Sequence, residues 1–166
     1  MSDNETGGER QRAVTLRFLA EPGEVNFGGK VHGGTVMKWI DQAGYTCAVG
    51  WSGRYCVTVY VGGIRFIQPI QIGELVEVRA RLIYTGTTSM QIAVDVMAAD
   101  PKNAKLRKAT HCIIVFVAVD ADGRPVAVPA WAALSEEDKA LEDYARKLMG
   151  LRNGIEAEMQ RYLSAE

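Results

Sequence analysis

The chain has 166 residues, and its 19 lysines and arginines nearly balance 20 aspartates and glutamates, for a formal net charge of −1. That length allows one domain with a substantial core plus an appendage, and the balanced charge gives no basis for nucleic-acid binding. The chain has no run of roughly 18 apolar residues that could span a membrane, and its polar amino terminus lacks a signal core, so we expect a cytoplasmic protein without a membrane partner.

In chain order, residues 1–12 are polar and are expected to form a disordered tail. Alternating apolar and polar residues predict a half-buried strand over 13–20. A turn at 21–24 and a glycine-rich loop then lead into an amphipathic helix, whose apolar residues recur at intervals of three and four. Glycines predict that this helix ends near Gly50 or Gly53.

The segment 54–128 is expected to be mostly strand. The alternating valines at its start are followed by the pair Gly62-Gly63, which predicts a bulge. Further strands are predicted over 75–84, 90–98 and 112–119, with a hairpin between the first two and a basic loop before the last.

The remaining residues, 131–166, form a helical extension outside the main domain, 13–130. Ser135 and Asp138 have the spacing of a helix-capping box, and Asn153-Gly154 is expected to divide the extension into two helices. The extension is interpreted as a docked appendage, with a role in assembly as the alternative.

One helix followed by antiparallel strands predicts an α+β fold in which a curved sheet wraps a buried helix. A single helix cannot cover both faces and every edge of such a sheet. We therefore expect a dimer that pairs sheet edges.

Several chemistries are absent from the sequence. The string Gly50-Trp51-Ser52-Gly53 lacks the spacing of a serine-hydrolase elbow, and His32 and His111 are the only histidines. The glycines fit neither nucleotide-binding motif. Three widely spaced cysteines predict buried thiols rather than disulfides or zinc ligands, and we expect neither a metal nor a cofactor.

The candidate functional residues lie around the start of the long helix. They are the amide of Asn26, the open N–H groups of Gly33 and Gly34, the carboxylate of Asp41 and, less directly, His32. Each also has a purely structural interpretation: a turn for the asparagine, close packing for the glycines, a helix-entrance hydrogen bond for the histidine. Asp41 could also pair with Lys38 or Arg65.

Together these residues resemble the hot-dog-fold acyl-CoA thioesterases of the cytoplasmic family. The resemblance covers about residues 13–130 and rests on four blocks: Asn26-x-x-Gly29-x-x-His32-Gly33-Gly34-x-x-Met37-x-x-x-Asp41, Val57-x-Val59 with Ile64-x-Phe66-Ile67-x-Pro69-Ile70-x-x-Gly73-Glu74, the turn Gly86-Thr87-Thr88-Ser89, and Val115-Phe116-Val117-Ala118-Val119-Asp120-x-x-Gly123-Arg124.

The resemblance implies a long central helix wrapped by a five- or six-stranded antiparallel sheet, dimers with a continuous sheet, and trimers of dimers. It also implies two active sites per dimer, with Asn26 and Asp41 contributed by opposite subunits. In thioester hydrolysis, the N–H groups of Gly33 and Gly34 would hold the oxyanion. Asp41 would act as general base or, alternatively, as nucleophile, Asn26 would position water or thioester, and His32 would support the site.

The phosphates of coenzyme A require cations or backbone N–H groups. The basic cluster Lys105, Arg107 and Lys108 and the turn residues Gly86, Thr87 and Ser89 are the candidates. A solvated loop is the alternative interpretation of the cluster.

Two other functions remain open at this point. A hot-dog dehydratase of hydroxyacyl thioesters would use His32 as base and Asp41 as acid, although the His-Phe-Pro string of those relatives is absent. A non-catalytic acyl-CoA sensor usually carries an added DNA-binding unit, which the neutral charge does not favour.

Overall fold

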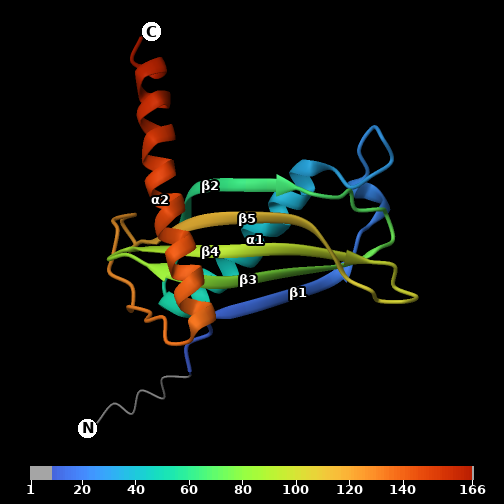
Figure 1. The fold of residues 1–166 in the computed structure, drawn as a ribbon, viewed down its shortest axis with the longest axis horizontal. Coiled ribbons are helices and arrows are strands. Elements are labelled where there is room, and N and C mark those ends of the chain that lie inside the picture. Colours follow the sequence, from blue (N-terminus) through green and yellow to red (C-terminus); the bar gives the residue numbers. More distant parts are fainter. Residues whose placement is uncertain (1–8, 166) are drawn as a thin grey trace.

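The computed structural model describes residues 9–165, which form one antiparallel sheet with a helix on each face (Figure 1). The helices are α1 (Gly33–Ser52) and α2 (Glu136–Leu163), with a short 3-10 turn at Pro22–Glu24. The strands are β1 (Ala13–Leu19), β2 (Cys56–Phe66), β3 (Leu75–Thr85), β4 (Ser89–Ala99) and β5 (Arg107–Ala118). Their order across the sheet is β1-β3-β4-β5-β2, so the predicted α+β fold with a five-stranded sheet is confirmed.

Helix α1 begins at a side-chain cap and ends at a glycine. The ring Nδ1 of His32 accepts a hydrogen bond from the Gly34 N–H at 3.0 Å, and Gly53 closes the helix in the left-handed conformation at φ 66°. The apolar face between these ends is buried against the sheet. Gly44 lies at the closest approach, because a Cβ there would come within 2.8 Å of the Phe116 ring.

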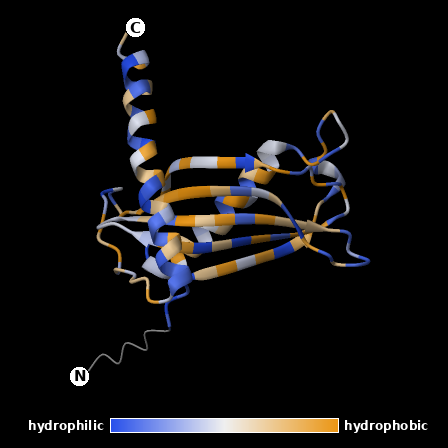
Figure 2. Cartoon of the chain, viewed as in Figure 1, coloured by the Kyte–Doolittle hydropathy of each residue, from blue (hydrophilic) through white to orange (hydrophobic). Residues whose placement is uncertain are grey.

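The core is divided between the two faces of the sheet. The larger part lies between α1 and the sheet, and the smaller part lies under α2 around Ile83, Ile113 and Ala145. Figure 2 shows the apolar and polar residues alternating along the strands, as burial on a pleated sheet requires. All three cysteines are free and buried, as predicted, and burial raises the pKa of Cys47 to about 12.

Two predicted boundaries are wrong. Strand β5 begins at Arg107, five residues before the expected start, because this basic segment pairs with β4 in register Ala98↔Arg107. The extension forms one helix of 28 residues and continues through Asn153-Gly154. An ion pair between Arg152 and Glu156, one turn apart, spans that position.

Other predictions agree with the structure or concern the amino terminus. The register of β2 against β5 shifts between Gly62 and Arg65, which confirms the bulge. The Ser135 hydroxyl caps α2 by accepting a hydrogen bond from the Asp138 N–H.

Residues 1–8 of the expected amino-terminal tail lie outside the described residues. Arg12, in contrast, pairs with Asp138 at 2.6 Å and is therefore held in place. No helix within residues 9–165 has the length and apolarity to cross a bilayer.

Candidate active site

Asp41 and a threonine on the edge strand form the centre of the site. The Thr58 hydroxyl on β2 donates a hydrogen bond to Asp41 Oδ1 at 2.6 Å. Both residues are exposed in the single chain, and no ion pair to Asp41 occurs within the described part of the chain, so neither Lys38 nor Arg65 neutralises it. The carboxylate keeps its second oxygen available to solvent and lies on the side of α1 that borders the β2 edge.

Sequence reasoning did not select Thr58. The residue stands in an apolar strand between two valines, and the alternation of a strand places its hydroxyl on the face opposite theirs. That alternation was the available signal, since Asp41 is the acidic residue on the neighbouring helix.

Asn26 organises the loop before α1. Its side-chain Oδ1 accepts from the backbone N–H groups of Gly28 at 2.8 Å and Lys30 at 3.0 Å, and its own N–H donates to the Lys30 carbonyl at 2.6 Å. The structural interpretation of Asn26 as a turn residue is therefore correct as far as its oxygen is concerned. Within residues 9–165 its side-chain NH₂ has no hydrogen-bond acceptor, and Asn26 has no hydrogen bond to Asp41.

The backbone N–H groups of the two glycines at the start of α1 differ, because only one of them already has a hydrogen-bond acceptor. The Gly34 N–H is already bonded to the His32 ring. The Gly33 N–H has no acceptor among the hydrogen bonds of the described residues, and the ring of Phe66 lies 3.7 Å from the position of a Cβ on Gly33. One N–H at the positive end of the helix is therefore without an acceptor among the described residues.

The candidate residues for coenzyme A do not form one cluster. The Arg107 guanidinium donates to both carboxylate oxygens of Glu74, at 2.7 and 2.8 Å, and to the Pro69 carbonyl. These hydrogen bonds hold the pKa of Glu74 below its ordinary value. Lys108 pairs with Asp95 at 3.1 Å on the other face of the strand, whereas Lys105 is exposed.

Several backbone groups of the turn 86–89 also make hydrogen bonds within the chain. The Gly86 N–H donates to the Ser89 carbonyl at 2.9 Å, which closes the hairpin. The Ser89 hydroxyl lies 2.6 Å from the position of a Cβ on Gly86, so only glycine fits there without a shift. The Thr87 carbonyl accepts from the Val128 N–H.

Comparisons with known proteins agree with this fold and site. A thioesterase superfamily model matches residues 28–105. The acyl-CoA thioester hydrolase YciA of Salmonella typhimurium is 36% identical over 131 residues, which are 76% of this chain and 95% of that protein. An acyl-CoA hydrolase from Staphylococcus aureus, solved with butyryl coenzyme A and coenzyme A, superposes with a TM-score of 0.85 at 26% identity, over 93% of this chain and 94% of its own. An apo hexameric acyl-CoA thioesterase superposes with a TM-score of 0.84 at 26% identity, over 89% and 94% of the two chains.

Structures of three alanine variants of the Staphylococcus aureus enzyme, at an asparagine, an aspartate and a threonine, match as well. Those positions are 15 and 17 residues apart, and the same intervals separate Asn26 from Asp41 and Asp41 from Thr58.

The sheet order and the central helix buried against the sheet define a hot-dog fold. The chain belongs to the hot-dog-fold acyl-CoA thioesterases of the thioesterase superfamily, and it is an enzyme of the thioester hydrolase class.

Proposed function

We propose that this enzyme hydrolyses fatty acyl-CoA to the free acid and coenzyme A, with Asp41 as general base. The observation that carries the proposal is the Thr58–Asp41 hydrogen bond, because it fixes one carboxylate oxygen and leaves the other for a water molecule. That water attacks the thioester carbonyl carbon and transfers a proton to Asp41. The tetrahedral intermediate then expels the thiolate of coenzyme A, which takes the proton from Asp41 and so regenerates the carboxylate.

The oxyanion of this intermediate needs donors placed in advance. The open N–H of Gly33 at the start of α1 is the candidate, and a donor of this kind is typically worth on the order of 10²–10³ in rate. The NH₂ group of Asn26 would orient water or thioester, while its oxygen keeps the loop in shape. Gly34 would contribute only if the His32 ring turned away.

The site is completed by a second copy of the chain. Asn26 has no contact with Asp41 through the hydrogen bonds of residues 9–165, and Asp41 lies beside β2, which has a neighbour on one side only. Pairing of two β2 strands would continue the sheet and bring Asn26 of one subunit to Asp41 of the other. We propose a homodimer on this basis, and a trimer of dimers by similarity to the hexameric relative. In that assembly Lys105 is the remaining basic candidate for the phosphates of coenzyme A, because Arg107 and Lys108 are paired with Glu74 and Asp95.

The test is release of coenzyme A from a series of acyl-CoA chain lengths. Asp41→Asn should lower kcat by about 10²–10⁴, since the amide cannot accept the proton. Thr58→Val should lower kcat by roughly 10–10² with little change in KM, and Thr58→Ser should restore much of the rate, because Thr58 acts through Asp41.

Asp122→Asn, an equal change of charge in an exposed turn, is the control and should keep the wild-type rate. Full activity of Asp41→Asn would rule out its role as base. If the wild type releases no thiol at any chain length, the proposed fatty acyl-CoA substrate is wrong, and thioesters of other acyl groups have to be tested.

A further inference from the structure

Helix α2 is longer than the sheet that it covers. Its first half lies on the sheet face opposite α1, where Leu141, Tyr144, Ala145 and Leu148 pack against Ile83 and Ile113. Figure 1 shows the helix crossing the sheet towards β2 and then projecting beyond that edge strand. The part of the helix that follows the residues packed on the smaller core, residues 151–163, is here called the α2 extension.

The apolar face of α2 continues along this extension. Leu151, Ile155, Met159 and Tyr162 follow Leu148 at intervals of three and four, so they share the face that the first half buries. Within the single chain these side chains are exposed, with fractions of 65%, 52%, 59% and 72%. An isolated helical segment of this length is marginal in water, and an apolar face of this kind is typical of an interaction surface.

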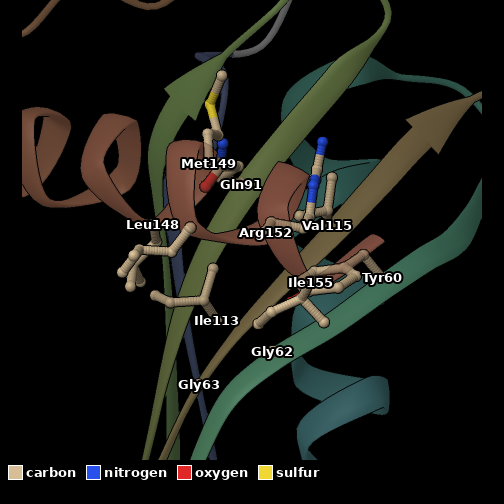
Figure 3. A pocket seen from close by; sticks show the side chains of 11 residues that line it. Tyr60, Gly62, Gly63, Gln91, Ile113, Val115, Leu148, Met149, Arg152 and Ile155 are labelled. Carbon is tan, nitrogen blue, oxygen red and sulfur yellow. The ribbon is translucent and has the colours of Figure 1, made fainter. Parts of the chain in front are cut away.

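A small apolar cavity lies where the helix leaves the sheet. It has a volume of about 210 Å³ and is bounded by Leu148, Leu151 and Ile155 of the helix and by Tyr60, Ile113 and Val115 of the strands (Figure 3). Gly62 and Gly63 of β2 also line it, and the Tyr60 ring occupies the space where a side chain on Gly62 would lie. It lies on the face of α2, away from Asp41, and is therefore separate from the catalytic centre.

The direction of the extension identifies its partner. Any sheet continued at β2 would lie directly beneath the projecting face, and β2 itself exposes Val59 and Val61 in the single chain. The charges of the extension are already satisfied by neighbours on the same helix, in the pairs Arg152–Glu156 and Glu158–Arg161. An apolar, charge-neutral surface matches the outer sheet face of another copy rather than a charged ligand.

We propose that the α2 extension lies across the outer sheet face of a second copy paired through β2, and clamps the dimer. This inference rests on the β2 pairing in the proposed function, but not on the catalytic roles. The two-fold symmetry of such a dimer makes the contact reciprocal, so each subunit holds the other. Side chains of the second copy would close the cavity beside Tyr60.

Sedimentation velocity of the full chain over a dilution series tests the clamp. The double variant Ile155→Glu with Met159→Glu places two charges on the apolar face. The matched control, Asn153→Glu with Gln160→Glu, places two charges on the opposite face of the same helix. Since backbone pairing through β2 remains, the first variant should dissociate at concentrations at least about tenfold higher than the wild type, and the control should not. Circular dichroism checks that both variants remain folded.

Cross-linking provides a second measurement that does not depend on the affinity. Because all three native cysteines are buried, a benzophenone maleimide can be attached selectively to Ile155→Cys. Illumination should give adducts between two chains, and Asn153→Cys should give far fewer.

Equal dissociation of the two double variants, or adducts within one chain only, would overturn the clamp while leaving the proposed dimer intact. A wild type that is monomeric at every concentration would overturn both the clamp and the proposed dimer. The acyl-CoA assay, which is independent of these measurements, decides the catalytic proposal.

Discussion

At the scale of single residues, Asn26 and Asp41 each use one side-chain atom for hydrogen bonds within the chain and have a second polar atom for the proposed reaction. The Asn26 oxygen holds the loop through two backbone N–H groups, while its NH₂ is left over. One carboxylate oxygen of Asp41 accepts a hydrogen bond from the Thr58 hydroxyl, and the other oxygen has no hydrogen bond within residues 9–165. This explains why sequence patterns left the structural and functional interpretations open: spacing locates a side chain, but it does not tell which of its atoms is already bonded.

Substitution of Asn26 separates its two uses. Asn26→Asp keeps an oxygen acceptor for the Gly28 and Lys30 N–H groups but loses the NH₂ donor, whereas Asn26→Ala loses both. If the NH₂ group serves the reaction, both variants should lose kcat by a factor of about 10². Only the alanine variant should lower the thermal midpoint, because two loop N–H groups lose their acceptor. A fully active Asn26→Asp would limit the residue to the loop.

At the scale of elements, the sequence predicted the type and order of the strands and of α1 correctly. Their signals are local, since alternation, capping residues and a terminal glycine are all visible in the chain. The continuity of α2 was missed because an isolated glycine does not by itself end a helix. The start of β5 was missed because it depends on a contact between distant parts of the chain. Arg107 is drawn into the strand by Glu74, which is 33 residues away, and a sequence window does not contain that contact.

The packing of α1 predicts opposite results for two glycines of that helix. A Cβ on Gly44 would come within 2.8 Å of Phe116 and 2.9 Å of Ile114, so Gly44→Ala should destabilise the fold by about 1–3 kcal/mol. Gly50→Ala meets nothing closer than 3.5 Å, and should stabilise by about 0.5–1 kcal/mol through helix propensity. Urea unfolding of both variants measures the difference. A Gly44→Ala protein as stable as Gly50→Ala would contradict the close packing.

The Glu74–Arg107 pair predicts a dependence of stability on pH. Since Arg107 lowers the pKa of Glu74 in the folded chain, the stabilisation is complete above the ordinary value of 4.5 and is lost as the pH falls through the lowered pKa. Arg107→Met should therefore cost about 1–3 kcal/mol at pH 7 and progressively less below pH 4.5. Urea midpoints at pH 7 and at successively lower pH test this. A deficit that is equally large in acid would assign the loss to packing alone.

At the scale of the whole molecule, the proposed site is divided between two chains. The single-chain structure leaves Asp41 exposed beside an unpaired strand edge, and within residues 9–165 no hydrogen bond joins Asn26 to it. The expected sharing of these residues between subunits came from a family resemblance, and neither composition nor periodicity would have suggested it. The α2 extension projects beyond the same edge, so the proposed composite site and the proposed clamp both depend on pairing through β2.

The most direct test of this account mixes two inactive proteins. Asn26→Ala and Asp41→Ala subunits, unfolded together in equal amounts and refolded, should form mixed dimers with one intact site and one site that lacks both residues. Random pairing in a symmetric dimer predicts recovery of about one quarter of the wild-type acyl-CoA hydrolysis, whereas each variant refolded alone stays inactive. Absence of recovery in dimers shown to contain both variants would mean that Asn26 and Asp41 act within the same chain, and would contradict the composite site.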